Sequence, residues 1–164
     1  MTGRQRTLPL GGLATCHGME QRISFVTLAV LDLARSRRFY VDGLGWTPEL
    51  DVPGEVLMFG AGDRLMLSLW DRSAFAQEVG GPVLDGPGIV PMTLSHNVAT
   101  ATEVRHVLAL ARDAGASVWG PVERDWGGFS GYFADPDGFR WEVAWNPGPI
   151  GLRVVPDTDV DAGP

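Results

Sequence analysis

Apolar and polar positions follow the same order along two stretches of the chain. In the first stretch, the apolar and β-branched residues 23–30 predict a strand. Asp32 follows as a helix N-cap, and the helix that it begins is expected to end at Gly43 and Gly45. Three short strands are expected after the helix, near residues 46–51, 55–60 and 64–70.

The second stretch repeats this plan. Residues 91–98 predict a strand, and Thr100 with Glu103 has the spacing of a helix capping box. Gly115 is expected to end that helix. Three more strands are predicted near residues 117–119, 128–134 and 138–145.

The repeated order indicates a duplicated βαβββ unit and an α+β fold, in which two modules form an open, cup-shaped mixed sheet. The domain is expected to span 21–146, with a first module at about 22–80 and a second at about 89–146. Residues 1–20 are interpreted as a flexible N-terminal extension, in which Met1 and Met19 are both candidate starts. Residues 147–164 are interpreted as a loose, Pro- and Gly-rich tail.

Strand alternation predicts which side chains point away from the helices. In the first strand, Val26, Leu28 and Val30 form an apolar row that should pack under the helix. The opposite faces are more polar, as expected for a sheet that curls around a semi-polar pocket. The residues expected to line this pocket are Thr27, Met66, Ser68, Trp70, Thr93, Ser95, Asn97, Ser130, Tyr132, Arg140 and Glu142, with Trp126 and Phe129 at its rim.

Composition excludes several classes of function. The net charge of −7 argues against nucleic-acid binding, which needs a basic surface. All 13 basic residues are arginine, so neither Schiff-base catalysis nor a P-loop lysine is available. No apolar run is long enough to span a bilayer, and no secretory signal is recognisable, so we expect a cytoplasmic protein. Cys16 is the single cysteine and is interpreted as an incidental thiol.

Two motifs resemble a known family. The first runs from Val26 to Tyr40 and continues with Gly-Leu-Gly-Trp at 43–46. The second is Gly-Tyr-Phe-Ala-Asp-Pro-Asp-Gly-Phe-Arg-Trp-Glu at 131–142, in which residues 135–138 have the composition of a tight turn. Over about residues 22–146 the chain resembles the vicinal oxygen chelate superfamily, which includes glyoxalases, bleomycin resistance proteins and dioxygenases.

The resemblance implies paired βαβββ modules, a homodimer, and a divalent metal held by one His or Glu from each of four strands. Of the four ligand positions, only Glu142 matches, because the others fall near Phe25, Ser68 and Pro91. We therefore expect no metal or other cofactor at these positions. A weak hard-cation site made of Thr93, Ser95, Asn97 and Glu142 oxygens stays open as an alternative.

The histidines add little to a metal site. His96 points to the wrong face unless its strand bulges, and is interpreted as a structural histidine. His106 falls on the polar side of the second helix, and His17 lies in the N-terminal extension. Two roles are open for the carboxylate of Glu142. In an apolar pocket desolvation would suit it to general acid/base chemistry, whereas Arg140 on the same face would hold it as a structural or ligand-binding carboxylate.

Four of the six tryptophans fall into two groups. Trp46 and Trp141 are predicted to pack in the core, whereas Trp70 and Trp126 fall where a pocket rim forms. The alternative for Trp126 and Phe129 is that they plug a Gly-rich turn, because glycines stand at 127, 128 and 131.

Three hypotheses about function follow. The first is metal-independent binding or sequestration of a small molecule, planar and cationic because the pocket is aromatic and the protein acidic. The second is a glyoxalase- or dioxygenase-like lyase, isomerase or oxygenase, which uses Glu142 as acid/base or a non-standard metal site. The third is an interaction module whose pocket is vestigial.

Overall fold

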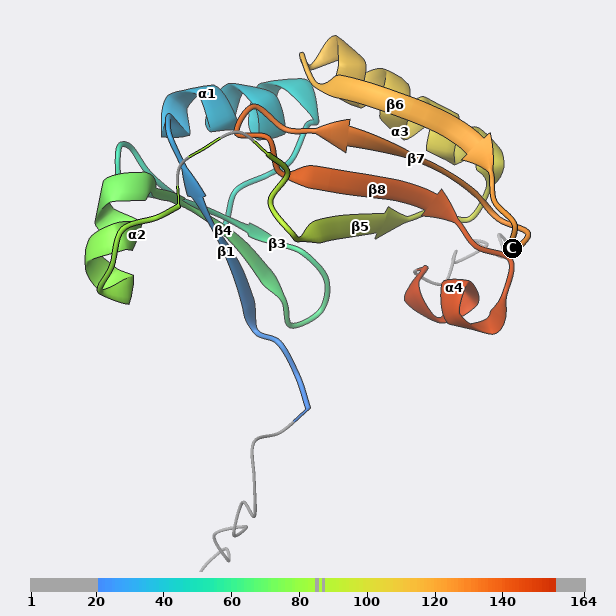
Figure 1. Ribbon diagram of the computed structural model, residues 1–164, viewed down its shortest axis with the longest axis horizontal. Coiled ribbons are helices and arrows are strands. Elements are labelled where there is room, and N and C mark those ends of the chain that lie inside the picture. The colour runs from blue at the N-terminus through green and yellow to red at the C-terminus, as the bar shows by residue number, and fades with distance from the viewer. Residues whose placement is uncertain (1–20, 85, 87, 156–164) are drawn as a thin grey trace, which may run out of the picture.

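The computed structural model describes residues 21–155 except 85 and 87 (Figure 1). The expectations for residues 1–20, including those for Cys16 and His17, lie outside the described residues. The same holds for residues 156–164 of the expected tail. Among the described residues, no helix is long and apolar enough to cross a membrane.

The first module contains one four-stranded mixed sheet. Its strands lie in the order β1-β4-β3-β2, with β1 parallel to β4 and the other neighbours antiparallel. The elements are β1 (Phe25–Val30), α1 (Leu33–Arg37), η1 (Arg38–Gly43), β2 (Leu50–Val52), β3 (Val56–Gly60), β4 (Met66–Asp71) and α2 (Arg72–Val79).

The second module repeats the topology in its own sheet, with the strand order β5-β8-β7-β6 and a parallel β5–β8 pair. The elements are β5 (Thr93–Asn97), α3 (Ala101–Asp113), β6 (Ser117–Glu123), β7 (Phe129–Ala134), β8 (Arg140–Trp145) and α4 (Pro149–Val154). The predicted α+β fold of two βαβββ modules is thus confirmed, although the two sheets do not close into one barrel.

Local sequence signals begin the helices as predicted. The Asp32 carboxylate accepts a hydrogen bond from the Arg35 amide (3.0 Å), and Thr100 and Glu103 form a complete capping box. The first helix continues beyond α1 as the wider π-helix η1, which the sequence does not predict. Gly43 at its end lies close to the end of α3, because a Cβ at this position would overlap the Ala114 Cβ.

Several boundaries differ from the expected ones. The segment after Trp46 begins its strand only at Leu50, because Trp46 packs against the core. Strand β6 runs on to Glu123 across a register shift that Gly120 and Pro121 occupy. The chain also contains two helices that the sequence analysis lacks. Asp71 caps α2 through the amides of Ser73 and Ala74, and residues 149–154 form α4, so the expectation of a loose tail is wrong there.

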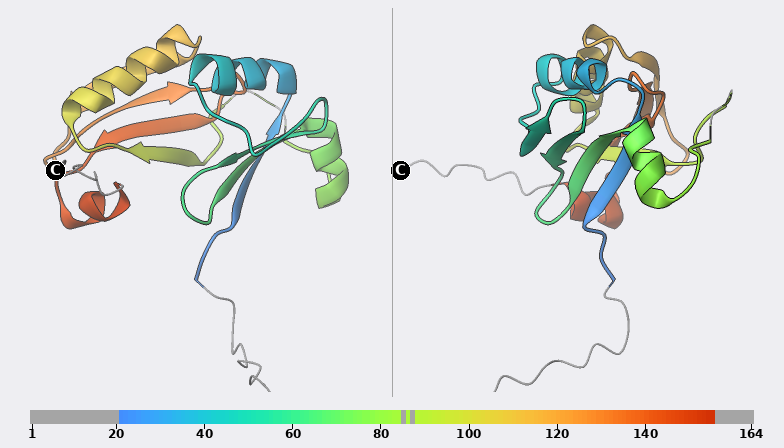
Figure 2. Two further views of the ribbon diagram at one scale, coloured as in Figure 1. Left: turned by 180° about the vertical axis from the view of Figure 1, so that it is seen from behind. Right: turned by 90° about the vertical axis from the view of Figure 1, so that its left-hand side faces the viewer.

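Strand alternation is confirmed in the core. The side chains of Leu28, Val30, Leu67 and Leu69 are buried on the helix-facing side of the first sheet. Trp141 and Val143 are buried on the corresponding side of the second. Figure 2 shows α1 and α3 on the same side of the molecule, where they cover both sheets.

An aromatic cluster joins the two modules. Tyr40 from η1 lies 5.7 Å from Phe59 of β3 and 6.3 Å from Trp141 of β8, measured between ring centroids. Trp46 meets Trp141 edge to face at 5.7 Å, and Phe133 stacks on Trp141 at 5.9 Å. The helix-facing sides of the two sheets therefore share one core.

The turn between β7 and β8 crosses from the second module into the first. The Tyr40 hydroxyl donates to the Asp135 carboxylate (2.7 Å) and accepts a hydrogen bond from Trp141 Nε1 (3.1 Å). Asp135 also accepts bonds from the amides of Asp137 and Phe139, both at 3.0 Å. Burial, followed by the charge of Asp135, raises the pKa of Tyr40, so the phenol stays protonated as a donor.

Asp137 makes a second set of contacts across the module boundary. Its carboxylate, with the side chain only 3% exposed, accepts hydrogen bonds from the Leu31 amide (2.9 Å), Arg35 Nη2 (3.1 Å) and the buried Ser36 hydroxyl (3.0 Å). A buried carboxylate with three donors fixes position as well as charge. The turn of residues 135–138 therefore locks the second module onto the start of α1.

Replacement of Asp137 by alanine would remove the acceptor of the Leu31 amide, the ion-pair partner of Arg35 and one of the two acceptors of the buried Ser36 hydroxyl, which would keep only the Asp32 carbonyl (3.1 Å). We expect Asp137→Ala to lower the free energy of unfolding by about 3 kcal/mol, measured by urea denaturation. Asp42→Ala is the control, because the Asp42–Arg37 pair (3.5 Å) is exposed and should contribute little. Equal losses in both variants would contradict the role given to the turn.

Asp135 makes stability depend on pH. Burial raises the pKa of Asp135 to about 6, although its hydrogen bonds oppose the shift. The folded chain then binds this proton more tightly than the unfolded chain, so the contribution of Asp135 to stability is present below about pH 4 and lost as the pH rises through about 6. A shift of this size corresponds to roughly 3 kcal/mol.

We expect this contribution to disappear in Asp135→Asn, which is neutral at every pH. The difference in unfolding free energy between Asp135→Asn and the parent should grow in favour of the variant between pH 4 and 7. NMR titration of the carboxyl carbon reads the pKa directly, and an ordinary value near 4 would contradict the prediction.

Candidate functional site

The sequence-predicted pocket residues fall on two separate surfaces. The first-module face is the side of the first sheet that lacks α1, and it carries Thr27, Met66, Ser68 and Trp70. The second-module face is the corresponding side of the second sheet, and it carries Thr93, Ser95, Asn97, Trp119, Ser130, Tyr132, Arg140 and Glu142.

The two faces do not meet within one chain. The opposite sides of the sheets, which carry Phe59 and Trp141, share the aromatic core between the modules. Because side chains alternate along a strand, the first-module and second-module faces point outward from that core. Figure 1 shows the two sheets as separate, open layers.

The second-module face holds a row of polar groups across three strands. Register places Ser95 beside Glu142, and Glu142 beside Tyr132. The Ser95 hydroxyl lies 3.5 Å from Glu142 Oε2, the limit of a hydrogen bond. Burial raises the pKa of Tyr132, and the charge of Glu142 and a hydrogen bond to it raise it further. Glu142 therefore lies among hydroxyls, half-buried, and not in an apolar pocket.

Two arginines lie over aromatic rings on this face. The Arg140 guanidinium is 3.8 Å from the centre of the Trp119 ring, and Arg124 is 5.8 Å from the centre of Tyr132. Arg124 Nε also donates to the buried Ser130 hydroxyl (2.8 Å). Neither Trp119 nor Arg124 was among the predicted pocket residues, and the strand predicted at 117–119 continues to Glu123, which brings Arg124 to this side of the sheet.

The first-module face contains two buried polar atoms without a partner. Ser68 is 1% exposed, and neither its Oγ nor Trp70 Nε1 has a hydrogen-bond partner among the described residues. Phe75 of α2 meets the Trp70 ring edge to face at 6.4 Å. Buried polar groups are usually satisfied, so these two atoms mark a place where a bound water, a ligand or a second chain could supply the missing hydrogen bonds beneath this face.

Two of the predicted rim residues lie elsewhere. Phe129 belongs to the core on the helix-facing side of β7, where the Arg105 guanidinium lies 4.3 Å from its ring centre, so its placement in the pocket is wrong. Trp126 is half-exposed in the loop before β7, and a Cβ on Gly128 would overlap its ring. Trp126 thus covers the Gly-rich turn, as the alternative reading proposed.

The residues at the family's four metal positions do not fit a metal site. Glu142 has a ligating carboxylate, but Phe25, Pro91 and Ser68 offer at most one neutral hydroxyl. Within the described residues, no three His, Cys, Asp or Glu side chains lie where they could hold an ion together. His106 is exposed on α3. His96 lies on the helix-facing side of the sheet, as strand alternation predicted, next to a cavity between the modules.

Comparison with known proteins gives the family of the chain. The model of the glyoxalase/bleomycin resistance protein/dioxygenase superfamily matches residues 22–143. A glyoxalase-related enzyme from Fulvimarina pelagi is 36% identical with a TM-score of 0.71, and the match covers 78% of this chain and 90% of that chain. A glyoxalase/bleomycin resistance protein/dioxygenase from Nocardioides is 25% identical with a TM-score of 0.67, covering 81% and 91%.

A more distant structure shares the fold alone. This is an antibiotic-binding protein from Streptomyces sp. CB03234, 22% identical with a TM-score of 0.56, covering 79% of this chain and 99% of that chain. No curated protein matches the sequence. The model match and the 36% identical relative, together with the duplicated modules, show that the chain belongs to the glyoxalase/bleomycin resistance protein/dioxygenase superfamily.

Proposed function

We propose that the protein binds a small planar molecule without a metal, and that the second-module face forms the main wall of the binding site. The observation that carries this proposal is the arrangement of Trp119, Arg140, Tyr132, Glu142 and Ser95 on one side of one sheet. Trp119 is 45% exposed, although Arg140 lies over its ring, so the exposed part of the indole is accessible to a ligand. The hydroxyls and charges beside it can orient polar groups of the ligand.

A second copy of the chain completes the site in this proposal. Each chain has a first-module face and a second-module face that point apart, so one chain supplies two half-sites. Pairing the first-module face of one copy with the second-module face of another encloses the ligand. It also covers the face that carries Ser68 and Trp70, whose buried Oγ and Nε1 lack partners within the described chain.

Glu142 is the residue that we assign to a cationic group of the ligand. The ligating groups at the family's metal positions do not support a metal-centred role, which leaves this carboxylate free to act as a counter-charge. Arg124 and Arg140 lie over rings of the same face, so the ligand meets charges of both signs. The antibiotic-binding Streptomyces protein supports only the general point that this fold can hold a small molecule.

An enzymatic role is the alternative, and one observation favours it. The carboxylate of Glu142 lies beside the hydroxyls of Ser95 and Tyr132, an arrangement suited to moving a proton to or from a bound substrate. The 36% identical relative is a glyoxalase-related enzyme. In this alternative Glu142 acts as general acid or base in a lyase, isomerase or oxygenase reaction, or joins a non-standard metal site.

Isothermal titration with a planar aromatic cation and its neutral analogue tests the role of Glu142. We expect Glu142→Gln to weaken binding of the cation about fivefold, a loss of about 1 kcal/mol, and to leave the neutral analogue unchanged. Glu123→Gln is the control, because Glu123 is exposed on the same sheet and outside the second-module face. The metal content of the parent and of Glu142→Gln is measured alongside the titration. If the parent holds one equivalent of metal and the variant has lost it, the result favours the enzymatic alternative.

Mixed dimers test whether the site is shared between chains. Trp70→Ala and Glu142→Ala each damage one half-site, so dimers of either variant alone should bind the probe weakly. In a mixed dimer, one pairing joins two intact faces, and binding should return at one site per mixed dimer. Recovery in the mixture supports the shared site, whereas its absence from mixed dimers isolated by two affinity tags contradicts it.

A further inference from the structure

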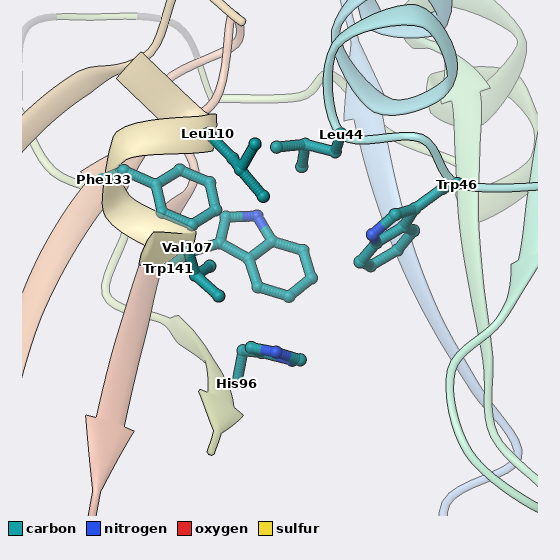
Figure 3. A pocket seen from close by; sticks show the side chains of 7 residues that line it. All are labelled: Leu44, Trp46, His96, Val107, Leu110, Phe133 and Trp141. Carbon is teal, nitrogen blue, oxygen red and sulfur yellow. The ribbon is translucent and has the colours of Figure 1, made fainter. Parts of the chain in front are cut away.

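A cavity of about 190 Å³ lies between the two modules, on the helix-facing side of the second sheet. Figure 3 shows Trp46 reaching it from the first module, and His96 and Trp141 from the second. Leu44 and Leu110 lie above these rings in the same view. The cavity is thus separated from the second-module face by the sheet itself, since His96 and Ser95 point to opposite sides of β5.

The walls of this cavity are aromatic and already held in place. Trp141 is fixed by its hydrogen bond to Tyr40 and by stacking on Phe133, with an interplanar angle of 5°. Trp46 is held edge to face against both Phe59 and Trp141. Because these side chains are packed by the inter-module core, the cavity does not need a rearrangement to form.

One polar ring faces this apolar space. His96 extends from β5 toward Trp141 and Trp46, and it makes no hydrogen bond with the described residues (Figure 3). The side chain of His96 is exposed at the edge of the cavity, and its partial burial there lowers its pKa, so the imidazole is neutral near pH 7 and carries one donor and one acceptor. A neutral, unpaired imidazole beside aromatic walls selects for a ligand with one polar group on an aromatic ring.

The size of the cavity limits the ligand to one or two rings. Drug-sized ligands need pockets of roughly 300 Å³ or more, whereas an apolar cavity of about 150 Å³ holds benzene. Leu110 is 39% exposed at the edge of the cavity, so a small ligand has a path from solvent. Neither a large antibiotic nor a metal-bound substrate fits this space.

We propose that the inter-module cavity is a second binding site, for a small neutral aromatic molecule that carries one hydroxyl or ring N–H. The ring occupies the space bordered by Trp46, Trp141 and His96, and its polar group exchanges a hydrogen bond with the His96 imidazole. Because the cavity has walls from both modules, the bound ligand also holds the modules in their relative positions. This site is independent of the function proposed for the outward-pointing faces.

Phenol and toluene form a matched pair of probes, since they differ in the hydroxyl that His96 would bind. We expect both to shift the backbone amide resonances of Leu44, His96, Val107 and Leu110 in two-dimensional NMR, with phenol binding more tightly. His96→Phe should weaken phenol about fivefold, the loss of one hydrogen bond, and leave toluene nearly unchanged. His106→Phe, an exposed position on α3, is the control and should change neither.

A second variant separates this cavity from other binding surfaces. Leu110→Trp places a larger side chain at the edge of the cavity and should remove binding of both probes, whereas Glu142→Gln on the far side of the sheet should not. Resonance shifts that persist in Leu110→Trp, or that centre on residues of the second-module face, would overturn the proposal. Absence of any shift at millimolar phenol would overturn it equally.

Discussion

The relative position of the two modules depends on two carboxylates in the turn between β7 and β8. Asp135 is 5% exposed and accepts a hydrogen bond from Tyr40, whose hydroxyl in turn accepts one from Trp141, while Asp137 contacts the start of α1. Carboxylates this deeply buried must keep their donors, so the geometry of the contact tolerates little displacement. The shared aromatic core, the outward direction of the two faces and the cavity between the modules all follow from this fixed contact.

The sequence predicts much of the local structure and little of this contact. The apolar rows of β1 and β8, the caps at Asp32 and Thr100 and the duplicated order are readable because each arises within a few residues. The turn composition of residues 135–138 is readable in the same way. Its partners are not, because Leu31, Arg35 and Ser36 lie 101–106 residues away along the chain.

The candidate site also contains a part that the sequence predicts and a part that it does not. Alternation correctly places Ser95, Glu142 and Tyr132 on one side of the second sheet, because it needs only the strand periodicity. Trp119 was missed because no face was assigned to the short strand predicted at 117–119, although its pairing with Tyr132 puts it on this side, and the continuation of the strand to Glu123 through the register shift at Gly120 was not predicted either. Strand periodicity also says nothing about how two sheets are oriented, so the separation of the two faces became visible only in the structure.

The close approach of η1 to α3 has a consequence for how this protein can diverge. A side chain on Gly43 would overlap the side chain of Ala114, and the next residue, Leu44, borders the cavity. The small size of Gly43 and Ala114 therefore allows the short distance between η1 and the end of α3. A lineage that exchanged Gly43 for a bulkier residue would have to move η1 away from the end of α3, and Leu44 with it, so the shape of the cavity can change through a position that does not border it.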